Sequence, residues 1–516
     1  MNNYYSNKTK QFGVILMRKD AFYRESSILI FSNIGTGILG FMFSIILSKI
    51  LGAEGVGLYG LIMPIYNLVI CLICGGIIAA LSKTSAYYFV NNDYKNIKKT
   101  VKISVSFDLV WSVSIVAIFF FLAPLVGEHI VKDPRSQYAL KIICPAMIFI
   151  AISNILKGFF YGTSKTIVPA LIDVGEKFIR ISFFIFILNV TKAKTVEECV
   201  SLAYLTLCIG ELISLALLYI FYKIFTKDKN ESPKEESYSK LLKDVLMISL
   251  PLCAYSFLTT GIGTISSLIV PRRLIAAGFT YKESLALLGK FSGMSLTIAL
   301  FPMIVISAFS TILIPNLSQM IASKEYDYIK ERTGEVLHIS LLVGLATSVI
   351  CTLVPSYLGW LFYKSQDITS YIQFASFIAP FIYISVTTQS ILNGLGKSSI
   401  LLRNSVLCSI IELALIYVLS SIKIINVYGI GIAAILSNII LIALNYYEIK
   451  KAIIPNFNFY DIIVSFLLSI LTYFILRGVI YNASSLNFYI KTFLPILLSF
   501  VVILFGGIKL SSNRTK

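Results

Sequence analysis

Four charged residues lie in one stripe within an apolar segment, Ile167 to Val190, that is long enough to span a membrane. At positions i, i+3, i+4 and i+7, which share one helical face, stand Asp173, Glu176, Lys177 and Arg180. Ionised groups at bilayer depth are costly and normally face a bundle interior or a water-filled cavity. The stripe therefore predicts a polar compartment inside the membrane, and a transporter more than an anchor.

Two interpretations of this stripe are open. In the first, Asp173 pairs with Lys177 and Glu176 with Arg180, so that the helix neutralises its own charges. In the second, the stripe lines a cavity, where the two bases contact an anionic headgroup and the two acids couple to a cation or proton. We favour the second, because Arg180 lies near the middle of the span, too deep to reach the interface easily.

Three further acids lie within apolar spans, namely Glu211, Glu412 and Asp108. Glu211 is midway along a span antiparallel to the fifth, so it can reach the depth of Arg180, in a structural ion pair or a functional one. Glu412 has no basic residue within two turns, which makes it a candidate for proton coupling. Asp108 is only one to two turns into its span and is expected near the interface.

Basic residues at the ends of spans are the remaining binding candidates. Arg272 and Arg273 follow Pro271 at the expected outer end of the seventh span. They either hold phosphate as a substrate leaves or anchor to headgroups of the outer leaflet. Lys49 and Lys290 are lesser candidates of the same kind.

The composition is that of a polytopic membrane protein. Of 516 residues, 57% are hydrophobic and 14% charged, whereas soluble domains are about a quarter charged. Fourteen apolar segments reach the ~20 residues that a spanning helix needs. They are residues 26–50, 58–82, 101–125, 138–161, 167–190, 199–225, 242–270, 287–313, 336–361, 371–393, 400–421, 427–447, 460–481 and 490–510.

The net charge of +18 is distributed by position. If the start is cytoplasmic, the inner segments carry roughly twice as many Lys and Arg residues as the outer ones, which places both termini inside. These residues flank apolar spans and are expected to face anionic lipid headgroups, so nucleic acid is not an expected partner. No removed signal peptide is expected either.

Several kinds of chemistry are not indicated. The chain has no Walker loop, so ATP does not drive it directly, and no soluble catalytic domain. His129 and His338 are the only histidines, both near expected interfaces, so no metal site is predicted. Cys71 and Cys74 form a Cys-x-x-Cys pattern within an apolar stretch, where a redox or metal role is not expected. We predict no enzyme activity and no cofactor.

The charged segment after the sixth span divides the chain. The predicted organisation is an N-terminal six-helix lobe (1–225), a cytoplasmic linker (226–243), a second six-helix lobe (244–447), and two additional helices with a cytoplasmic tail (448–516). A faint repeat supports it: Ile155-Leu156-Lys157-Gly158 resembles Ile391-Leu392-Asn393-Gly394, and the next span of each half holds Glu176 or Glu412. Such repeats are typical of transporters with a substrate site between two lobes.

Glycine and proline interrupt several spans. They concentrate in the second, seventh and eighth, where bending is predicted because proline removes a backbone donor. The interrupting residues are Pro64, Gly75, Gly76, Pro251, Gly261, Gly263, Gly293, Pro302 and Pro315.

An ordered set of short motifs resembles a known family. The motifs are Gly52–Tyr59 (GAEGVGLY), Met63–Tyr66 (MPIY), Gly75–Ile77, Leu81–Lys83, Gly158–Gly162 (GFFYG), Glu176–Arg180 (EKFIR), Val270–Leu274 (VPRRL), Ala277–Gly278, Gly289, Gly293–Met294, Phe301–Pro302 and Leu313–Ser318 (LIPNLS). In this order they resemble the polysaccharide-export flippases, including the sporulation-type members, of the multidrug/oligosaccharidyl-lipid/polysaccharide (MOP) exporter superfamily. The resemblance covers nearly the whole chain.

The resemblance implies an all-α fold of about fourteen transmembrane helices, two six-helix lobes around a central cavity, and alternating access. It also implies a lipid-linked cell-wall or polysaccharide precursor as substrate. One departure is visible. Lipid II flippases of this superfamily carry cavity arginines on their first, second and eighth helices, but residues 26–48, 58–82 and 292–313 contain no basic residue here.

Our hypothesis is a flippase of the bacterial inner membrane for an undecaprenyl-pyrophosphate-linked saccharide, a peptidoglycan precursor for spore wall assembly. Proton, sodium ion or membrane potential would drive it. Two alternatives are a cation-coupled drug or metabolite exporter of the same fold and, less favoured because the outer loops are short, a membrane polymerase or ligase of glycans. A non-transporting scaffold is disfavoured by the buried charges.

Overall fold

The computed structural model describes residues 2–227, 235–322, 325–482 and 487–512. Over these residues the chain forms α-helices and two short π-helical segments, and no strand. The first half comprises α1 (Asn2–Cys74), α2 (Ile77–Val90), α3 (Tyr94–Leu125), η1 (Val126–Val131), α4 (Ser136–Ile142), α5 (Cys144–Gly162), α6 (Ile167–Thr191) and α7 (Val196–Thr226).

The second half begins with the long helix α8. Its elements are α8 (Tyr238–Ala276), α9 (Tyr281–Leu288), η2 (Gly289–Ser295), α10 (Leu296–Leu300), α11 (Met303–Ala322), α12 (Tyr326–Leu353), α13 (Pro355–Tyr363), α14 (Thr369–Gly394), α15 (Ser398–Leu419), α16 (Tyr428–Ala452), α17 (Phe459–Asn482) and α18 (Phe488–Ser512).

The predicted multi-pass membrane fold is confirmed. Among the described residues, eleven helices are long and apolar enough to cross a membrane, or twelve if the bent pair Tyr281–Leu300 and Met303–Ser310 forms one span. Helix α6 is not in that set, because its charges lower its apolarity. The first span in the set, Ser27–Val90, contains two expected spans, which a kink at Gly52 separates. The helix number is therefore close to the fourteen expected.

Helix breaks occur at two of the predicted places. Gly76, with φ of 76°, separates α1 from α2 within the expected second span. A bend of 59° before Met303 breaks the expected eighth span. Helix α8, by contrast, continues through Pro251 and Pro271 without interruption.

One expected boundary is wrong. The predicted ninth span, 336–361, is interrupted at Val354: α12 ends at Leu353, and Pro355 begins the separate helix α13. Proline suits the first turn of a helix, where its missing N–H is not needed, but it cannot continue α12. The expected breaks after the fourth and eleventh spans are confirmed, since α5 ends at Gly162 and α15 at Leu419.

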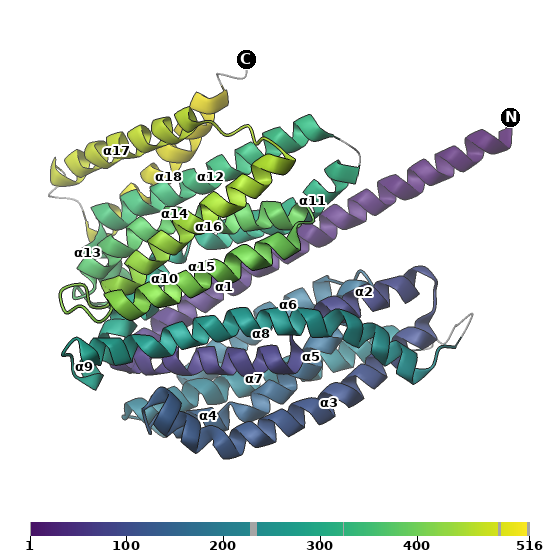
Figure 1. Ribbon diagram of the computed structural model, residues 1–516, viewed down its shortest axis with the longest axis horizontal. Helices are drawn as coiled ribbons and strands as arrows, with labels where there is room; N and C mark the ends of the chain where they lie inside the picture. Colours follow the sequence, from purple (N-terminus) through teal and green to yellow (C-terminus); the bar gives the residue numbers. More distant parts are fainter. Residues whose placement is uncertain (1, 228–234, 323–324, 483–486, 513–516) are drawn as a thin grey trace.

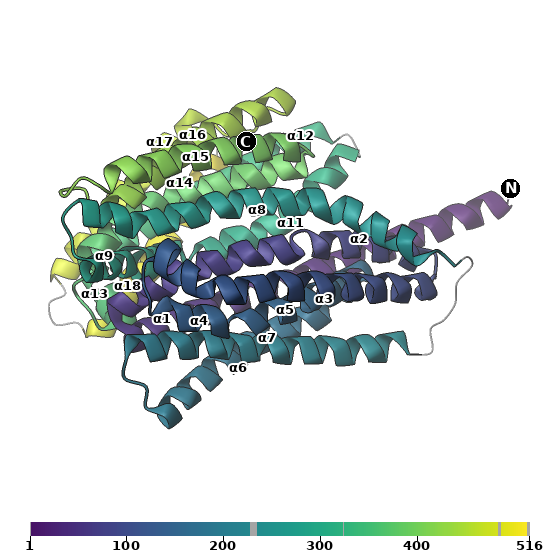
Figure 2. The ribbon, with the colours of Figure 1, turned by 60° about the horizontal axis from the view of Figure 1, so that its bottom comes forward.

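The helices form two bundles, with α2 to α7 on one side and α10 to α18 on the other (Figures 1 and 2). Helix α1 contacts both, because it packs on α6 and α7 and also on α9, η2 and α11. Helix α8 likewise contacts α1, α2 and α3 as well as α15. Helices α17 and α18 pack on α12 and on each other at the edge of the second bundle (Figure 1).

Part of the expected linker, residues 228–234, lies outside the described residues. Its far end is attached to α3. Glu235 pairs with Lys95 at 2.8 Å and with Lys99 at 2.6 Å, and the backbone N–H of Glu236 donates to the side chain of Asn96. The division of the chain into lobes at this linker stays a prediction.

The two bundles meet closely where α1 crosses α9 and η2. A Cβ atom at Gly289 would overlap the carbonyl oxygen of Ala53, and one at Gly57 would overlap that of Leu285. Glycine at both positions is therefore what lets the two backbones approach this closely. An ionic cluster holds the same region together: Arg135 pairs with Glu54 at 2.8 Å and with Asp133 at 2.8 Å, and Lys282 lies 3.6 Å from Glu54.

This packing generates a prediction. Gly289→Ala should lower the free energy of unfolding by about 1–3 kcal/mol, the usual cost of overpacking a tight contact. Gly60→Ala is the matched control, because no atom lies within 4 Å of its added Cβ and it is also in a helix. Thermal unfolding of the purified protein in detergent measures both. Equal midpoints for the two variants would contradict the role of this contact.

Candidate functional site

The charged stripe of α6 forms ion pairs different from those that its spacing allows. Asp173 pairs with Lys157 of α5 at 2.7 Å, and Lys177 pairs with its neighbour Glu176 at 2.7 Å. Neither of the two i, i+4 pairs is formed. The interpretation of the stripe as a helix that neutralises itself through those pairs is therefore wrong, because one acid is drawn to a neighbouring helix.

Arg180 is held by aromatic side chains of α1. It is 8% exposed. One of its terminal nitrogens donates to the hydroxyl of Tyr59 at 3.2 Å, and its guanidinium lies 4.5 Å from the ring centre of Phe43. Its Nε has no hydrogen-bond partner among the described residues. A desolvated guanidinium over an aromatic face is stabilised by the ring quadrupole, so no acid is needed to hold it.

Tyr59 is itself fixed by α7. Its ring stacks on that of Tyr204, with the centroids 4.8 Å apart, and the Tyr204 hydroxyl donates to the Tyr59 carbonyl oxygen at 2.8 Å. This stacking links α1, which contacts both bundles, to the environment of Arg180. A movement of α1 would therefore change what Arg180 contacts.

Glu211 of α7 joins the same group of charges. It is 9% exposed and lies within electrostatic range of Glu176, Arg180 and both lysines. Its neighbour Gly210 leaves room for Glu176, since a Cβ there would come within 2.6 Å of Oε1 of that acid. This Oε1 is buried and has no partner among the described residues.

We name these six residues the α6 cluster. Its members are Lys157, Asp173, Glu176, Lys177, Arg180 and Glu211. Lys177 and Asp173 keep about a third of their side-chain surface exposed, whereas Glu176 is 5% exposed. Three bases and three acids balance formally. Arg180 forms no ion pair with a described acid, and Oε1 of Glu176 accepts no hydrogen bond from a described residue. Both groups could therefore contact a ligand.

Lys157 is the member that sequence reasoning missed. It stands in the first copy of the internal repeat, where the other copy has Asn393. A lysine near the end of an apolar span was open to interpretation as an interfacial residue that reaches towards solvent. Its position four residues before the end of the span was the available signal.

The predicted basic residues outside α6 do not join the cluster. Arg272 donates to the carbonyls of His129 and Ile130, and Arg273 donates to the carbonyl of Tyr417 at 2.9 Å and lies 4.0 Å from its ring centre. They connect α8 to η1 and to α15. Lys49 is exposed on α1 and forms no ion pair with a described residue, while Lys290 lies 3.8 Å from Asp367.

Glu412 lines a different site, a cavity of about 360 Å³ where the two bundles meet. Residues of α1, α8, η2, α15 and α16 surround it, and no lysine or arginine is among its described lining residues. Oε2 of Glu412 accepts a hydrogen bond from Ser437 at 3.2 Å. The hydroxyl-bearing lining residues are Thr259, Ser266, Ser267, Ser292 and Ser409. This cavity is acidic and rich in hydroxyl groups.

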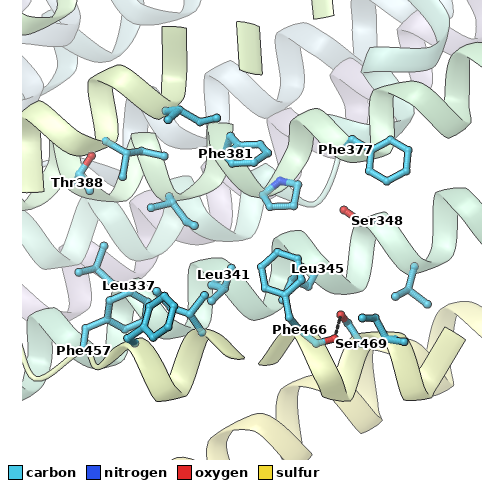
Figure 3. Close-up of a pocket in the computed structure, with 18 of the residues that line it drawn as sticks. Leu337, Leu341, Leu345, Ser348, Phe377, Phe381, Thr388, Phe457, Phe466 and Ser469 are labelled. Atoms are coloured by element: carbon cyan, nitrogen blue, oxygen red, sulfur yellow. Dashed lines mark hydrogen bonds between the residues drawn. The ribbon is translucent and has the colours of Figure 1, made fainter. Parts of the chain in front are cut away.

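A third feature, missed in the sequence, is an apolar groove of about 1000 Å³ (Figure 3). Helices α12, α14, α16 and α17 line it, so that the first of the two additional helices supplies one of its walls. Figure 3 shows Leu341 and Leu345 of α12 on one side, Phe377 and Phe381 of α14 on another, and Phe466 of α17 facing them. Its sequence signal was only that residues 460 onward stand outside the repeat.

Comparison with known proteins identifies the family. Residues 22–321, more than half of the chain, match the family described as polysaccharide biosynthesis protein. The chain belongs to the polysaccharide biosynthesis protein family. Residues 251–418 of this family member also match the MatE family. The predicted membership of the MOP superfamily is confirmed.

Relatives of this polysaccharide biosynthesis protein cover most of its length. It is 26% identical to "Stage V sporulation protein B" of Bacillus subtilis (strain 168) over 469 residues, which is 89% of each chain. Its fold resembles the structure "Lipid II flippase MurJ, inward closed conformation", with a TM-score of 0.67 and 14% identity over 97% of this chain and all of that one. An inward-facing multidrug resistance MATE family transporter gives a TM-score of 0.61 and 14% identity over 81% of this chain and 95% of that one.

The ion pair between α5 and α6 can be tested with a double-mutant cycle. Lys157→Met and Asp173→Asn should each lower the free energy of unfolding by about 1–3 kcal/mol, because each leaves a half-buried charge unpaired. The double variant should lose less free energy of unfolding than the two single variants lose together. The matched control is the exposed pair Lys330 and Asp327, 2.9 Å apart, whose coupling should stay below about 1 kcal/mol. Additive effects at Lys157 and Asp173 would contradict the pairing.

Proposed function

We propose that this chain is a flippase that moves an undecaprenyl-pyrophosphate-linked saccharide across the bacterial inner membrane by alternating access. Its proposed substrate is a peptidoglycan precursor for spore wall assembly. Membership of the MOP superfamily and the many membrane helices support a transporter, and the name of the Bacillus subtilis relative supports the link to sporulation. The particular precursor is part of the proposal.

The apolar groove carries this proposal. An isoprenoid tail gains little hydrophobic energy by moving from lipid into protein, because both are apolar. The groove would instead position the tail by contacts with Leu341, Phe381 and Phe466, and so keep the headgroup close to the bundles. The flippase structure matches 97% of the chain and the MATE structure 81%, which is the difference expected if the helices that complete the groove are shared with lipid transporters.

The α6 cluster is the proposed contact for the anionic headgroup. Lys177, which is partly exposed, would meet the pyrophosphate first. Arg180 would follow when α1 moves and withdraws Tyr59 and Phe43, since a guanidinium binds phosphate bidentately. Arg272, Arg273 and Lys49 would assist at the bundle ends.

Four acids are the proposed coupling groups, namely Asp173, Glu176, Glu211 and Glu412. A proton or sodium ion on one of them would change the charge balance of the membrane interior. Each charge moved through the field yields ~2.3 kcal/mol per 100 mV, so the membrane potential could bias the cycle without nucleotide. Both termini are proposed to lie in the cytoplasm, and the two bundles to move as lobes about the linker at 226–243.

A cation-coupled exporter of drugs or metabolites is the second candidate. The acidic cavity at Glu412 favours it, since a cavity with a carboxylate and no lysine or arginine in its described lining suits a cationic substrate. The two functions predict different effects of deleting and of overexpressing the protein. An exporter confers resistance to toxic cations when overexpressed, whereas loss of a flippase leaves its precursor on the inner leaflet.

The groove gives the first functional prediction. Leu345→Trp combined with Ile470→Trp narrows it from two facing helices and should slow flipping at least about tenfold, equivalent to about 1.4 kcal/mol or more of transition-state stabilisation. The control, Leu467→Trp combined with Leu471→Trp, adds two tryptophans to α17 at exposed positions that do not line the groove. The assay is reconstitution in vesicles with fluorescent undecaprenyl-pyrophosphate saccharide. Parental rates in both double variants would remove the groove from the mechanism.

The headgroup site gives the second. Arg180→Ala and Glu176→Gln should each reduce the flipping rate about tenfold or more, because the first removes the proposed phosphate contact and the second a coupling acid. The same vesicles measure it. Lys491→Ala, at the edge of the second bundle, should leave the rate unchanged. If both α6 variants flip at the parental rate, the site assignment fails while the groove result stands on its own.

A further inference from the structure

Asp108 occupies a position that the proposed transport cycle does not use. The structure buries its side chain to 3% exposure within α3, while the expectation that it lies near the membrane interface stays a prediction. Its Oδ2 has no hydrogen-bond partner, and no described lysine, arginine or histidine forms an ion pair with it. A buried carboxyl group with one oxygen unpaired and no counter-charge is costly and calls for an explanation.

Asp108 lines a cavity of about 350 Å³ that is separate from the α6 cluster, the Glu412 cavity and the apolar groove. The cavity lies where α8 passes the break between α1 and α2. A Cβ atom at Gly75 would come within 2.8 Å of the Cys253 backbone, so the chain approaches α8 closely at this break. The lining is almost entirely apolar, with Asp108 as its only charged member among the described residues.

Three aromatic side chains form part of the same lining, namely Phe107, Trp111 and Phe257. They are 39%, 44% and 36% exposed, so they also belong to the outer surface of the bundle, which in a membrane faces lipid. The Trp111 indole is oriented by its N–H, which donates to the Leu72 carbonyl at 3.3 Å. The cavity can therefore be reached from the bilayer, and three aromatic side chains line it together with one carboxyl group.

We propose that this cavity binds a lipophilic monocation, an amine or quaternary ammonium group carried on an apolar body. The carboxylate of Asp108 would neutralise the nitrogen and the aromatic faces would stabilise it by cation–π contact. The volume lies in the range of small-molecule sites. A divalent metal is disfavoured, since no group of three or more acids, cysteines or histidines stands together among the described residues. A lipid acyl chain would gain nothing from the carboxylate.

Tryptophan fluorescence can test this, because Trp111 is one of only two tryptophans. In a Trp360→Phe background, in lipid nanodiscs, benzyltrimethylammonium should quench Trp111 saturably. Asp108→Asn should weaken that affinity about tenfold or more, and Asp108→Glu, which keeps the charge, should keep it within about threefold. The uncharged isostere neopentylbenzene should bind the parent and Asp108→Asn equally. The proposal is overturned if the cation binds the parent and Asp108→Asn with equal affinity, or if it does not quench Trp111 saturably.

A second measurement needs no substitution. Cys253 lines the cavity, whereas Cys208, on α7, does not. Saturating benzyltrimethylammonium should slow alkylation of Cys253 by a membrane-permeant maleimide several-fold and leave Cys208 unchanged, with both sites read by peptide mass spectrometry. Neopentylbenzene at the same concentration should protect less. If the cation leaves the rate of Cys253 alkylation unchanged, the proposed site is contradicted. This result would hold even if the Asp108 variants failed to fold.

Discussion

Ionised side chains inside a bilayer must find partners within the protein, and this constraint organises the first bundle. The charged side chains of α6 do not all find an oppositely charged or hydrogen-bonding partner on α6 itself. Asp173 takes Lys157 from α5, Arg180 takes the hydroxyl of Tyr59 and the ring of Phe43 from α1, and Glu211 of α7 completes the group. Three neighbouring helices are thus fixed around one polar centre, because each alternative leaves a charge in lipid.

A second constraint, close backbone approach, joins the two bundles. Gly289 and Gly57 let α1 approach η2 and α9 where any side chain would collide, and the Arg135–Glu54 pair adds an ionic contact beside them. Helix α1 therefore contacts the interface between the bundles with one part and the α6 cluster with another. In a bistable bundle, a shift of such an element changes both places together. This is the physical basis on which a headgroup at Arg180 could be coupled to the arrangement of the bundles.

Three compartments of different character follow from these contacts. The α6 cluster is charged and balanced, the cavity at Glu412 is acidic and rich in hydroxyl groups, and the groove beside α17 is apolar. The proposed substrate has an anionic centre, a hydroxyl-rich end and a long apolar tail. The centre would suit the α6 cluster, the hydroxyl-rich end the cavity at Glu412, and the tail the groove beside α17. This separation of chemistries supports the proposed amphipathic substrate.

Much of this protein could be predicted from its sequence. Long apolar segments predicted the membrane helices, since backbone groups in lipid must be paired internally. Gly76 and Pro302 predicted two breaks, since local backbone geometry depends on such residues. The stripe from Asp173 to Arg180 predicted buried charge for the same reason. Pairing was decided only by the tertiary structure: the spacing allowed Asp173 to reach Lys177, but α5 placed Lys157 nearer. Tertiary packing also decided the burial of Asp108 and the walls of the groove, because both depend on which helices become neighbours, and periodicity along one helix carries no information about its neighbours.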